Sequence, residues 1–274
     1  MNQIYSIKNN KEVAVKEQAV ALCVGKTFLG FSITGHDGAV LHSLAWHTGT
    51  VVDKKTIADF FDTYPELSTG FSQVKIAYNF PQNILVPFKF YKEEESGQLL
   101  KKLHLVSNFD IISNDRIAGW QICNVFAVPE EIYLAIKNKF PQAQYVHQHT
   151  VSIHQLTNLP GNGSLQVNFG GTEFSVVAEN DGQLLLAQTY TYKTPADVLL
   201  QLLSCCQQYN LEQEKVKLVL SGLITQESAL YKELYQYFIH IDFAEVNGWQ
   251  LSDTEENYPA HFFTPLNQLA TCVL

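Results

Sequence analysis

Charged residues are scarce in this sequence. Only 16% of the 274 residues are Asp, Glu, Lys or Arg, against about 25% in an average soluble protein. Basic residues are scarcer still, because 18 Lys and Arg stand against 27 Asp and Glu and the net charge is −9. A nucleic-acid backbone requires a basic field on the protein, so this balance excludes nucleic acid as the main partner. Apolar residues make up 46% of the chain, which is enough to form a core.

The sequence also lacks long apolar runs and the cysteine patterns of metal or disulfide sites. No run approaches the roughly 20 residues of a membrane-spanning helix, and residues 1–16 are polar, without the apolar stretch of a signal peptide. The cysteines number five, an odd count, and none are spaced as CxxC, which disfavours a disulfide framework or a zinc site. We therefore predict a cytoplasmic protein with no transmembrane segment and with reduced, buried cysteines.

Two passages, 19–46 and 165–190, share a pattern of three apolar runs separated by turns. In both, the second turn contains Asp-Gly, which between apolar runs is a strong hairpin signal. A helix follows each passage, at 54–61 in the first and after Thr194, a suitable N-cap, in the second. Corresponding residues lie 143 to 145 positions apart: Gly25 and Gly170, Thr27 and Thr172, Phe31 and Phe174, Asp37 and Asp181.

This near-constant offset favours an internal duplication; the alternative is that any two antiparallel meanders look alike. A length of 274 residues fits two domains, at about 150 residues each. We predict a first half at 17–157 with an inserted subdomain at about 71–128, a flexible boundary at 158–163, and a second half at 163–274. Further elements are expected as strands at 74–90, 106–112, 120–128, 143–147, 216–220 and 238–244, and as helices at 92–105, 129–139, 150–156, 226–237 and 258–270.

Two such strand-turn-strand-turn-strand-helix-strand-helix-strand units resemble the superfamily of actin, sugar kinases and heat-shock-chaperone ATPases. More closely, the chain is similar to a bacterial domain-of-unknown-function family with an actin-like ATPase fold, whose ending resembles His261-Phe262-Phe263 and Cys272-Val273-Leu274. The resemblance implies an α/β fold of two ribonuclease-H-like halves with a cleft between them. The insertion resembles the extra subdomain of the pilus-assembly and cell-division members.

The superfamily binds nucleotide with three sequence pieces, and each has a counterpart here. The first is an Asp-x-Gly turn, which corresponds to Gly25, Lys26 and Thr27, with Val24 or Cys23 where the acid should stand. The second is Asp-x-Gly-x-x-Thr, in which Asn168 replaces the acid before Gly170, Gly171 and Thr172. The third is a Gly-Gly pair that opens a helix near the adenosine, and here it is reduced to Ser221 and Gly222.

The resemblance therefore implies phosphate and adenosine positions without the two acids that direct Mg²⁺. Phosphoryl transfer depends on positioning and on charge stabilisation through a metal, so we predict no catalytic residues, no metal and no required cofactor. The expected function is that of a non-catalytic protein that contacts a protein partner and binds nucleotide or phosphate weakly at most. The alternative is an active ATPase or small-molecule kinase that uses Mg-ATP, with an acid supplied from elsewhere, for instance Asp53 or Asp197. A metal- or thiol-dependent enzyme is a third alternative.

Two further local patterns resemble functional motifs, a P-loop and a histidine metal site, but the sequence does not support either. Gly25-Lys26-Thr27 matches the end of a P-loop, but that motif requires a glycine where Val20 stands. His147 and His149 would share one face of a strand, as metal ligands can, with His154 nearby. No neighbouring Cys or carboxylate completes a ligand set, so scattered surface or partly buried histidines are the favoured interpretation.

Overall fold

The computed structural model describes residues 1–8, 17–68, 70–156, 163–246, 248–249 and 258–273. The chain divides into two compact units. The first comprises the described parts of Met1–His154, Asn247–Glu256 and Leu266–Leu274, and the second those of Gln155–Val246 and Asn257–Pro265. The boundary predicted at 158–163 lies, apart from Gly163, outside the described residues.

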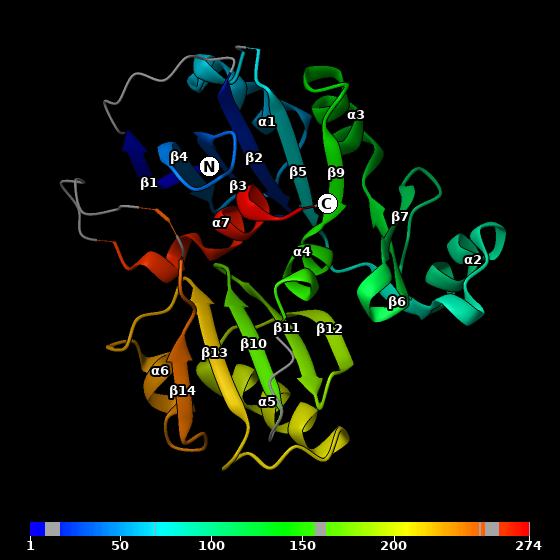
Figure 1. Ribbon diagram of the computed structural model, residues 1–274, viewed down its shortest axis with the longest axis vertical. Helices are drawn as coiled ribbons and strands as arrows, with labels where there is room; N and C mark the ends of the chain where they lie inside the picture. The colour runs from blue at the N-terminus through cyan, green and yellow to red at the C-terminus, as the bar shows by residue number, and fades with distance from the viewer. Residues whose placement is uncertain (9–16, 69, 157–162, 247, 250–257, 274) are drawn as a thin grey trace. The chain divides into compact units, whose positions relative to one another are not determined.

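A six-stranded sheet forms the centre of the first unit, in the order β1-β4-β3-β2-β5-β9 (Figure 1). Strand β2 (Gln18–Gly25), which lies between β3 and β5, is buried along almost its whole length, as its apolar sequence predicts. Helices α1 (Lys54–Thr63) and α3 (Glu130–Lys139) place Ile57, Phe60, Ile132 and Ile136 in the same core as this strand. The strands are β1 (Asn2–Lys8), β2 (Gln18–Gly25), β3 (Phe28–Gly35), β4 (Leu41–Thr48), β5 (Gln73–Asn79) and β9 (Gln144–His147), followed by α4 (Gln148–His154).

A five-stranded sheet forms the second unit, in the order β12-β11-β10-β13-β14. Its strands are β10 (Ser164–Phe169), β11 (Glu173–Asn180), β12 (Gln183–Thr191), β13 (Lys217–Gly222) and β14 (His240–Phe243). Helices α5 (Pro195–Gln208) and α6 (Ala229–Leu234) contribute to the core of this sheet. A capping box between Thr194 and Asp197 begins α5, as the sequence predicts.

The two sheets repeat one topology. Without β1, the first sheet reads β4-β3-β2-β5-β9, which is the order of the second sheet. In both, the first three strands pair antiparallel, the fourth pairs parallel with the third, and the fifth pairs parallel with the fourth. The predicted α/β fold class of two ribonuclease-H-like halves is therefore confirmed, whereas the internal duplication and the cleft between the halves stay predictions.

A separate three-stranded sheet, in the order β6-β8-β7, forms an insertion in the first unit. It contains β6 (Asn83–Pro87), the short 3-10 helix η3 (Phe88–Phe90), α2 (Glu93–Leu103), β7 (Ile111–Ile117) and β8 (Ile122–Val128). The predicted start of the insertion at about residue 71 is wrong, because β5 pairs with β2 and belongs to the main sheet. The strand predicted at 106–112 is also misplaced, because Ser107 and Asp110 form a turn that delays β7 until residue 111.

Both ends of the predicted halves require correction. Strand β1 precedes the predicted start at residue 17 and pairs with β4, and its alternating Tyr5 and Ile7 are buried. At the other end, the helical pattern predicted at 258–270 forms a 3-10 helix (Ala260–Phe263) and α7 (Thr264–Thr271). Residues from Leu266 onward belong to the first unit rather than to the second half. Within the described residues, no helix has both the length and the apolar character needed to cross a membrane.

Candidate functional site

The first glycine turn is closed by aromatic side chains. Gly25 ends β2 and is buried, and a Cβ atom added to it would lie 2.1 Å from Cε1 of Phe28. The Phe28 ring stacks on Trp46, with ring centroids 4.9 Å apart and planes 14° from parallel. Gly30 makes room for Trp46 in the same way. The glycine at position 25 is therefore explained by the packing of the Phe28 ring directly against the backbone.

The acid position beside this turn lies inside the core. Val24 has no exposed surface and packs in the main core of the first unit. Cys23 is equally buried, its Sγ lies 3.5 Å from Oε1 of Gln148, and burial raises the pKa of its thiol. Neither residue presents a carboxylate to a metal-bound water. Lys26 is exposed, and its carbonyl accepts a hydrogen bond from the N–H of Val52 at 2.8 Å.

The second glycine turn occupies the same topological position, between β10 and β11. The N–H of Gly170 donates to the carbonyl of Glu173 at 2.7 Å, and the Tyr192 hydroxyl donates to the carbonyl of Gly170 at 3.1 Å. Tyr192 also donates its N–H to the carbonyl of Thr172 at 3.0 Å. Gly171 and Thr172 are exposed. The tip of the turn therefore faces solvent, while its base is held by internal hydrogen bonds.

Parallel pairing of β10 with β13 brings the second and third pieces together. Asn168 lies opposite Ser221, and its Nδ2 donates to Oγ of Ser221 at 2.9 Å. Gly222, at φ +75°, ends β13 so close to β10 that an added Cβ would lie 2.2 Å from the carbonyl oxygen of Phe169. In the superfamily the corresponding pair opens a helix, whereas here α6 begins only at Ala229, within the helix predicted at 226–237. Gly222 is required by strand packing.

The two acids considered as substitutes serve as helix caps. Asp53 accepts hydrogen bonds from the hydroxyl and N–H of Thr56 at the start of α1, and these bonds lower the pKa of its carboxyl group. Asp197 accepts from the N–H groups of Lys193 and Thr194, which lower its pKa in the same way. Both carboxylates are therefore engaged at the start of their own helices.

A buried polar network in the first unit escaped the sequence analysis. Asn83 donates to Asn124 at 3.1 Å, and Asn124 donates to the hydroxyl of Thr150 at 3.0 Å. That hydroxyl and the N–H of His147 each donate to Oδ2 of Asp115 at 2.7 Å. The network joins the inserted sheet to β9 and α4. Its members come from four separate segments, so only hydrophobic context around single Asn and Asp residues could have suggested it.

The histidine cluster does not form the strand-face pair of a metal site. His147 ends β9 and His149 belongs to α4, so the two do not alternate on one strand. Both are buried, Nε2 of His147 lies 2.9 Å from the carbonyl oxygen of Phe80, and His154 is exposed. Among the described residues, no group of three or more His, Cys, Asp or Glu side chains is placed to hold a metal ion.

Asp115 should make the fold less stable as the pH rises. Burial raises the pKa of its carboxyl group to about 6, although its two hydrogen-bond donors oppose this. Since the unfolded value is about 3.9, the folded state binds more protons between these two pH values, and stability falls as the pH rises through them. Burial lowers the pKa of His147 to about 4, which has the opposite effect on stability.

The variant Asp115→Asn isolates this effect, because its amide oxygen keeps the role of acceptor and no longer titrates. Between pH 4 and pH 7 we expect the unfolding free energy of the variant, relative to that of the wild type, to increase by about 1–2 kcal/mol. This value is the free-energy equivalent of the pKa shift, reduced because Asp115 is partly exposed. Chemical denaturation of both proteins at several pH values measures the difference, in which the histidine contributions cancel. A pH-independent difference would contradict the assignment.

Comparisons with known proteins place the chain in a fold and a family. The profile of a family described as "Protein of unknown function (DUF3822)" matches residues 9–241. A Bacteroides thetaiotaomicron protein with an actin-like ATPase fold and unknown function is 18% identical, with a TM-score of 0.76 over 94% of this chain and 97% of that one. No curated protein sequence matches significantly.

Two other solved structures show the same fold at lower identity. The PilM-PilN type IV pilus biogenesis complex matches with 12% identity and a TM-score of 0.63, over 94% of this chain and 98% of that one. The ethanolamine utilization protein EutJ of Carboxydothermus hydrogenoformans matches with 8% identity and a TM-score of 0.51, over 97% and 92%. At these identities the likeness concerns the actin-like ATPase fold alone. The family match spans most of the sequence, and the chain therefore belongs to the DUF3822 family of proteins of unknown function.

Proposed function

We propose that this protein is a non-catalytic member of the actin-like fold that acts through contacts with a protein partner and binds phosphate weakly at most. The observation that carries the proposal is the replacement of both metal-directing acids, by the core residue Val24 and by Asn168, whose amide is bonded to Ser221. Charge stabilisation through a metal is central to phosphoryl transfer. Without a carboxylate at either position, the turns lack the means to hold hydrated Mg²⁺.

Weak phosphate binding is supported by the second turn alone. Gly171 and Thr172 are exposed at its tip, and backbone N–H groups in such turns can bind anions without any side-chain charge. At the first turn, Phe28 covers Gly25 and leaves less room for a phosphate. A protein partner agrees with the PilM structure, which was determined as a complex with PilN. The five cysteines are all free, which agrees with a reducing compartment such as the cytoplasm.

Purified protein should show no Mg-ATP turnover above background. Loss of one electrostatic contact to a transition state costs on the order of 10²- to 10³-fold in rate, and here two such contacts are missing. A phosphate-release assay measures the turnover, and thermal shift in the presence of phosphate measures residual binding.

The matched control is Gly171→Asp, which adds a carboxylate at the exposed tip of the second turn, where φ is not positive. We expect it to abolish any thermal shift caused by phosphate and to leave the background ATP signal unchanged. Multiple turnover by the wild type that this variant abolishes would overturn the proposal in favour of an ATPase or a small-molecule kinase.

A further inference from the structure

Exposed apolar side chains are concentrated on the inserted subdomain. Among the described residues, fourteen large apolar side chains are exposed, and five of these lie between residues 90 and 109. Phe90 is 68% exposed, and Leu99 and Leu103, one turn apart on α2, are 39% and 65% exposed. Scattered exposed leucines are ordinary, but a contiguous apolar patch marks an interaction site.

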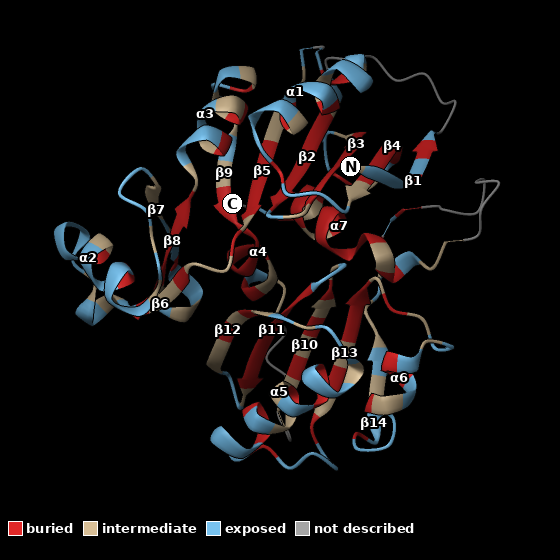
Figure 2. Ribbon diagram, turned by 180° about the vertical axis from the view of Figure 1, so that it is seen from behind, coloured by how far each residue is buried: buried red, intermediate tan, exposed pale blue. Residues whose placement is uncertain are grey.

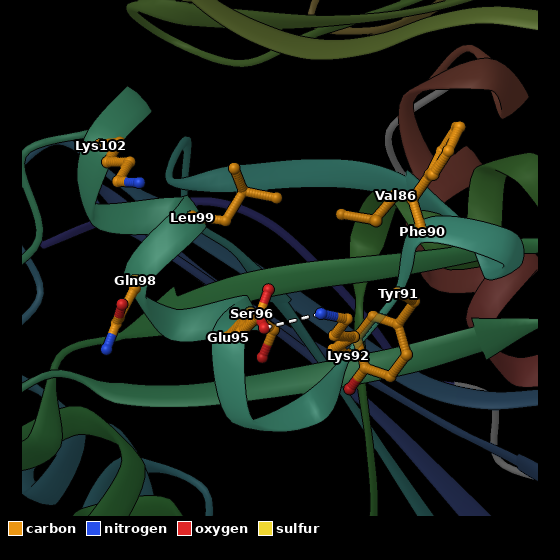
Figure 3. Close-up of a pocket in the computed structure, with 9 residues that line it drawn as sticks. All are labelled: Val86, Phe90, Tyr91, Lys92, Glu95, Ser96, Gln98, Leu99 and Lys102. Carbon is orange, nitrogen blue, oxygen red and sulfur yellow. Dashed lines mark hydrogen bonds and ion pairs between the residues drawn. The ribbon is translucent and has the colours of Figure 1, made fainter.

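Phe90 and Leu99 border a pocket between η3 and α2, and Leu103 lies on α2 one helical turn beyond Leu99 (Figure 3). One face of α2 lines it with Glu95, Leu99 and Lys102, which are spaced by whole helical turns. Val86 at the end of β6 lies across the opening from Leu99, and Phe90 stands beside Val86. The pocket measures about 290 Å³, which is at the lower end of the roughly 300–1,000 Å³ of small-molecule sites. Its size therefore suits one or two side chains of a larger partner better than a nucleotide.

Glu93, Glu94 and Glu95 lie in the first turn of α2, whereas its last turn, beside Leu99 and Leu103, carries the positive charges of Lys101 and Lys102. Lys92 is paired with Glu95 at 2.8 Å, whereas Lys102 forms no ion pair with any residue that the structure describes. Lys89 lies 4.7 Å from the ring centre of Phe90, so a second ammonium group stands beside the apolar residues. The last turn of α2 therefore combines exposed apolar side chains with a lysine that forms no ion pair among the described residues, on a chain whose net charge is −9. It complements a carboxylate next to an apolar side chain.

We propose that the surface formed by Val86, Phe90, Leu99, Lys102 and Leu103 is a docking site for a protein segment that presents an apolar side chain next to a carboxylate. This inference rests on the proposed function, in which the protein works through protein contacts, and it names the surface and the chemistry of the partner. The apolar side chain of the partner enters the pocket against Val86 and Leu99, and its carboxylate meets Lys102. The exposed Phe90 and Leu103 extend the apolar contact around the pocket, as in the core of a protein interface.

The test selects phage-displayed random 12-residue peptides on the immobilised full chain. We expect the selected peptides to share Leu, Ile or Phe within a few positions of Asp or Glu. Leu103→Glu should weaken their binding by about tenfold or more, which corresponds to about 1.4 kcal/mol. Lys102→Glu should weaken it by about three- to tenfold and should favour peptides in which Lys replaces the acid. Leu200→Glu is the matched control, because Leu200 on α5 is 63% exposed, close to the 65% of Leu103.

The proposal would be overturned by selected peptides without acidic residues, by equal binding to Leu103→Glu and Leu200→Glu, or by the absence of any selected peptide. A wild-type dimer in sedimentation velocity that Leu103→Glu alone dissociates would assign the surface to contacts between copies of the chain and would also overturn it. Failure of the proposed function would be seen in a different experiment, the phosphate-release assay, whose result does not depend on peptide binding. Thermal melting of each variant confirms that the exposed substitutions leave the fold intact.

Discussion

Gly222→Ala should destabilise the second unit by about 3 kcal/mol or more. A left-handed backbone conformation costs an L-residue roughly 1–2 kcal/mol, and Gly222 has φ +75°. The added Cβ would also lie 2.2 Å from the carbonyl oxygen of Phe169, a backbone atom that accepts a hydrogen bond from the N–H of Leu223. The contact cannot be relieved by a side-chain rotation, so the ends of β10 and β13 must separate.

Hydrogen exchange of β10 and β13, together with thermal melting of the full chain, measures this effect. The control is Gly119→Ala, since Gly119 has neither a positive φ nor any atom within 4 Å of an added Cβ. We expect the control to change stability by less than about 0.5 kcal/mol, as for an ordinary surface substitution. Wild-type exchange rates in Gly222→Ala would show that the strands do not meet so closely, and Gly222 would again need a functional explanation.

Lys75→Met should loosen the attachment of the end of the chain to the first unit. Lys75 is a buried lysine of β5, and its Nζ donates to the carbonyl oxygens of Ala270 at 3.0 Å and of Cys272 at 2.6 Å. Methionine keeps most of the volume but leaves both carbonyls without this donor. Hydrogen bonds from charged groups contribute about 1.5–3 kcal/mol each, so we expect a loss of about 3 kcal/mol or more.

The loss of stability should be confined to residues 264–273, and the segment should stay attached to the first unit because its other contacts remain. Ala270 lies so close to Gly38 that a Cβ added to Gly38 would be 2.5 Å from the carbonyl oxygen of Ala270. The carbonyl of Gly38 also accepts a hydrogen bond from the indole N–H of Trp249. Hydrogen exchange of 264–273 should accelerate in Lys75→Met. The exposed Lys54→Met is the control and should exchange like the wild type. Unchanged exchange in Lys75→Met would mean that the two hydrogen bonds do not hold α7 in place.

The repeated strand pattern was readable from the sequence because its signals are local. Asp181 and Gly182 both adopt positive φ, the conformation that a tight Asp-Gly hairpin requires, and they join β11 to β12 as predicted. Asn2–Lys8 was missed although Tyr5 and Ile7 alternate, because its partner β4 lies some forty residues away in the chain and nothing local specifies that pairing. Figure 2 shows how the main strands of both sheets are buried, while much of α2 is exposed.

For the candidate site, too, some features follow from the sequence and others only from the tertiary structure. The sequence alone determined which side chains stand at the acid positions, Val24 and Asn168, because a motif is a matter of residue identity and spacing. Only the tertiary structure decided what the glycines do: Phe28 packs on Gly25, and β10 passes against Gly222. It also decided where Lys75 points and how Asp115 is bonded, because these contacts join segments that are distant in the chain. Burial and close approach depend on the whole fold, and no local pattern of residue types encodes them.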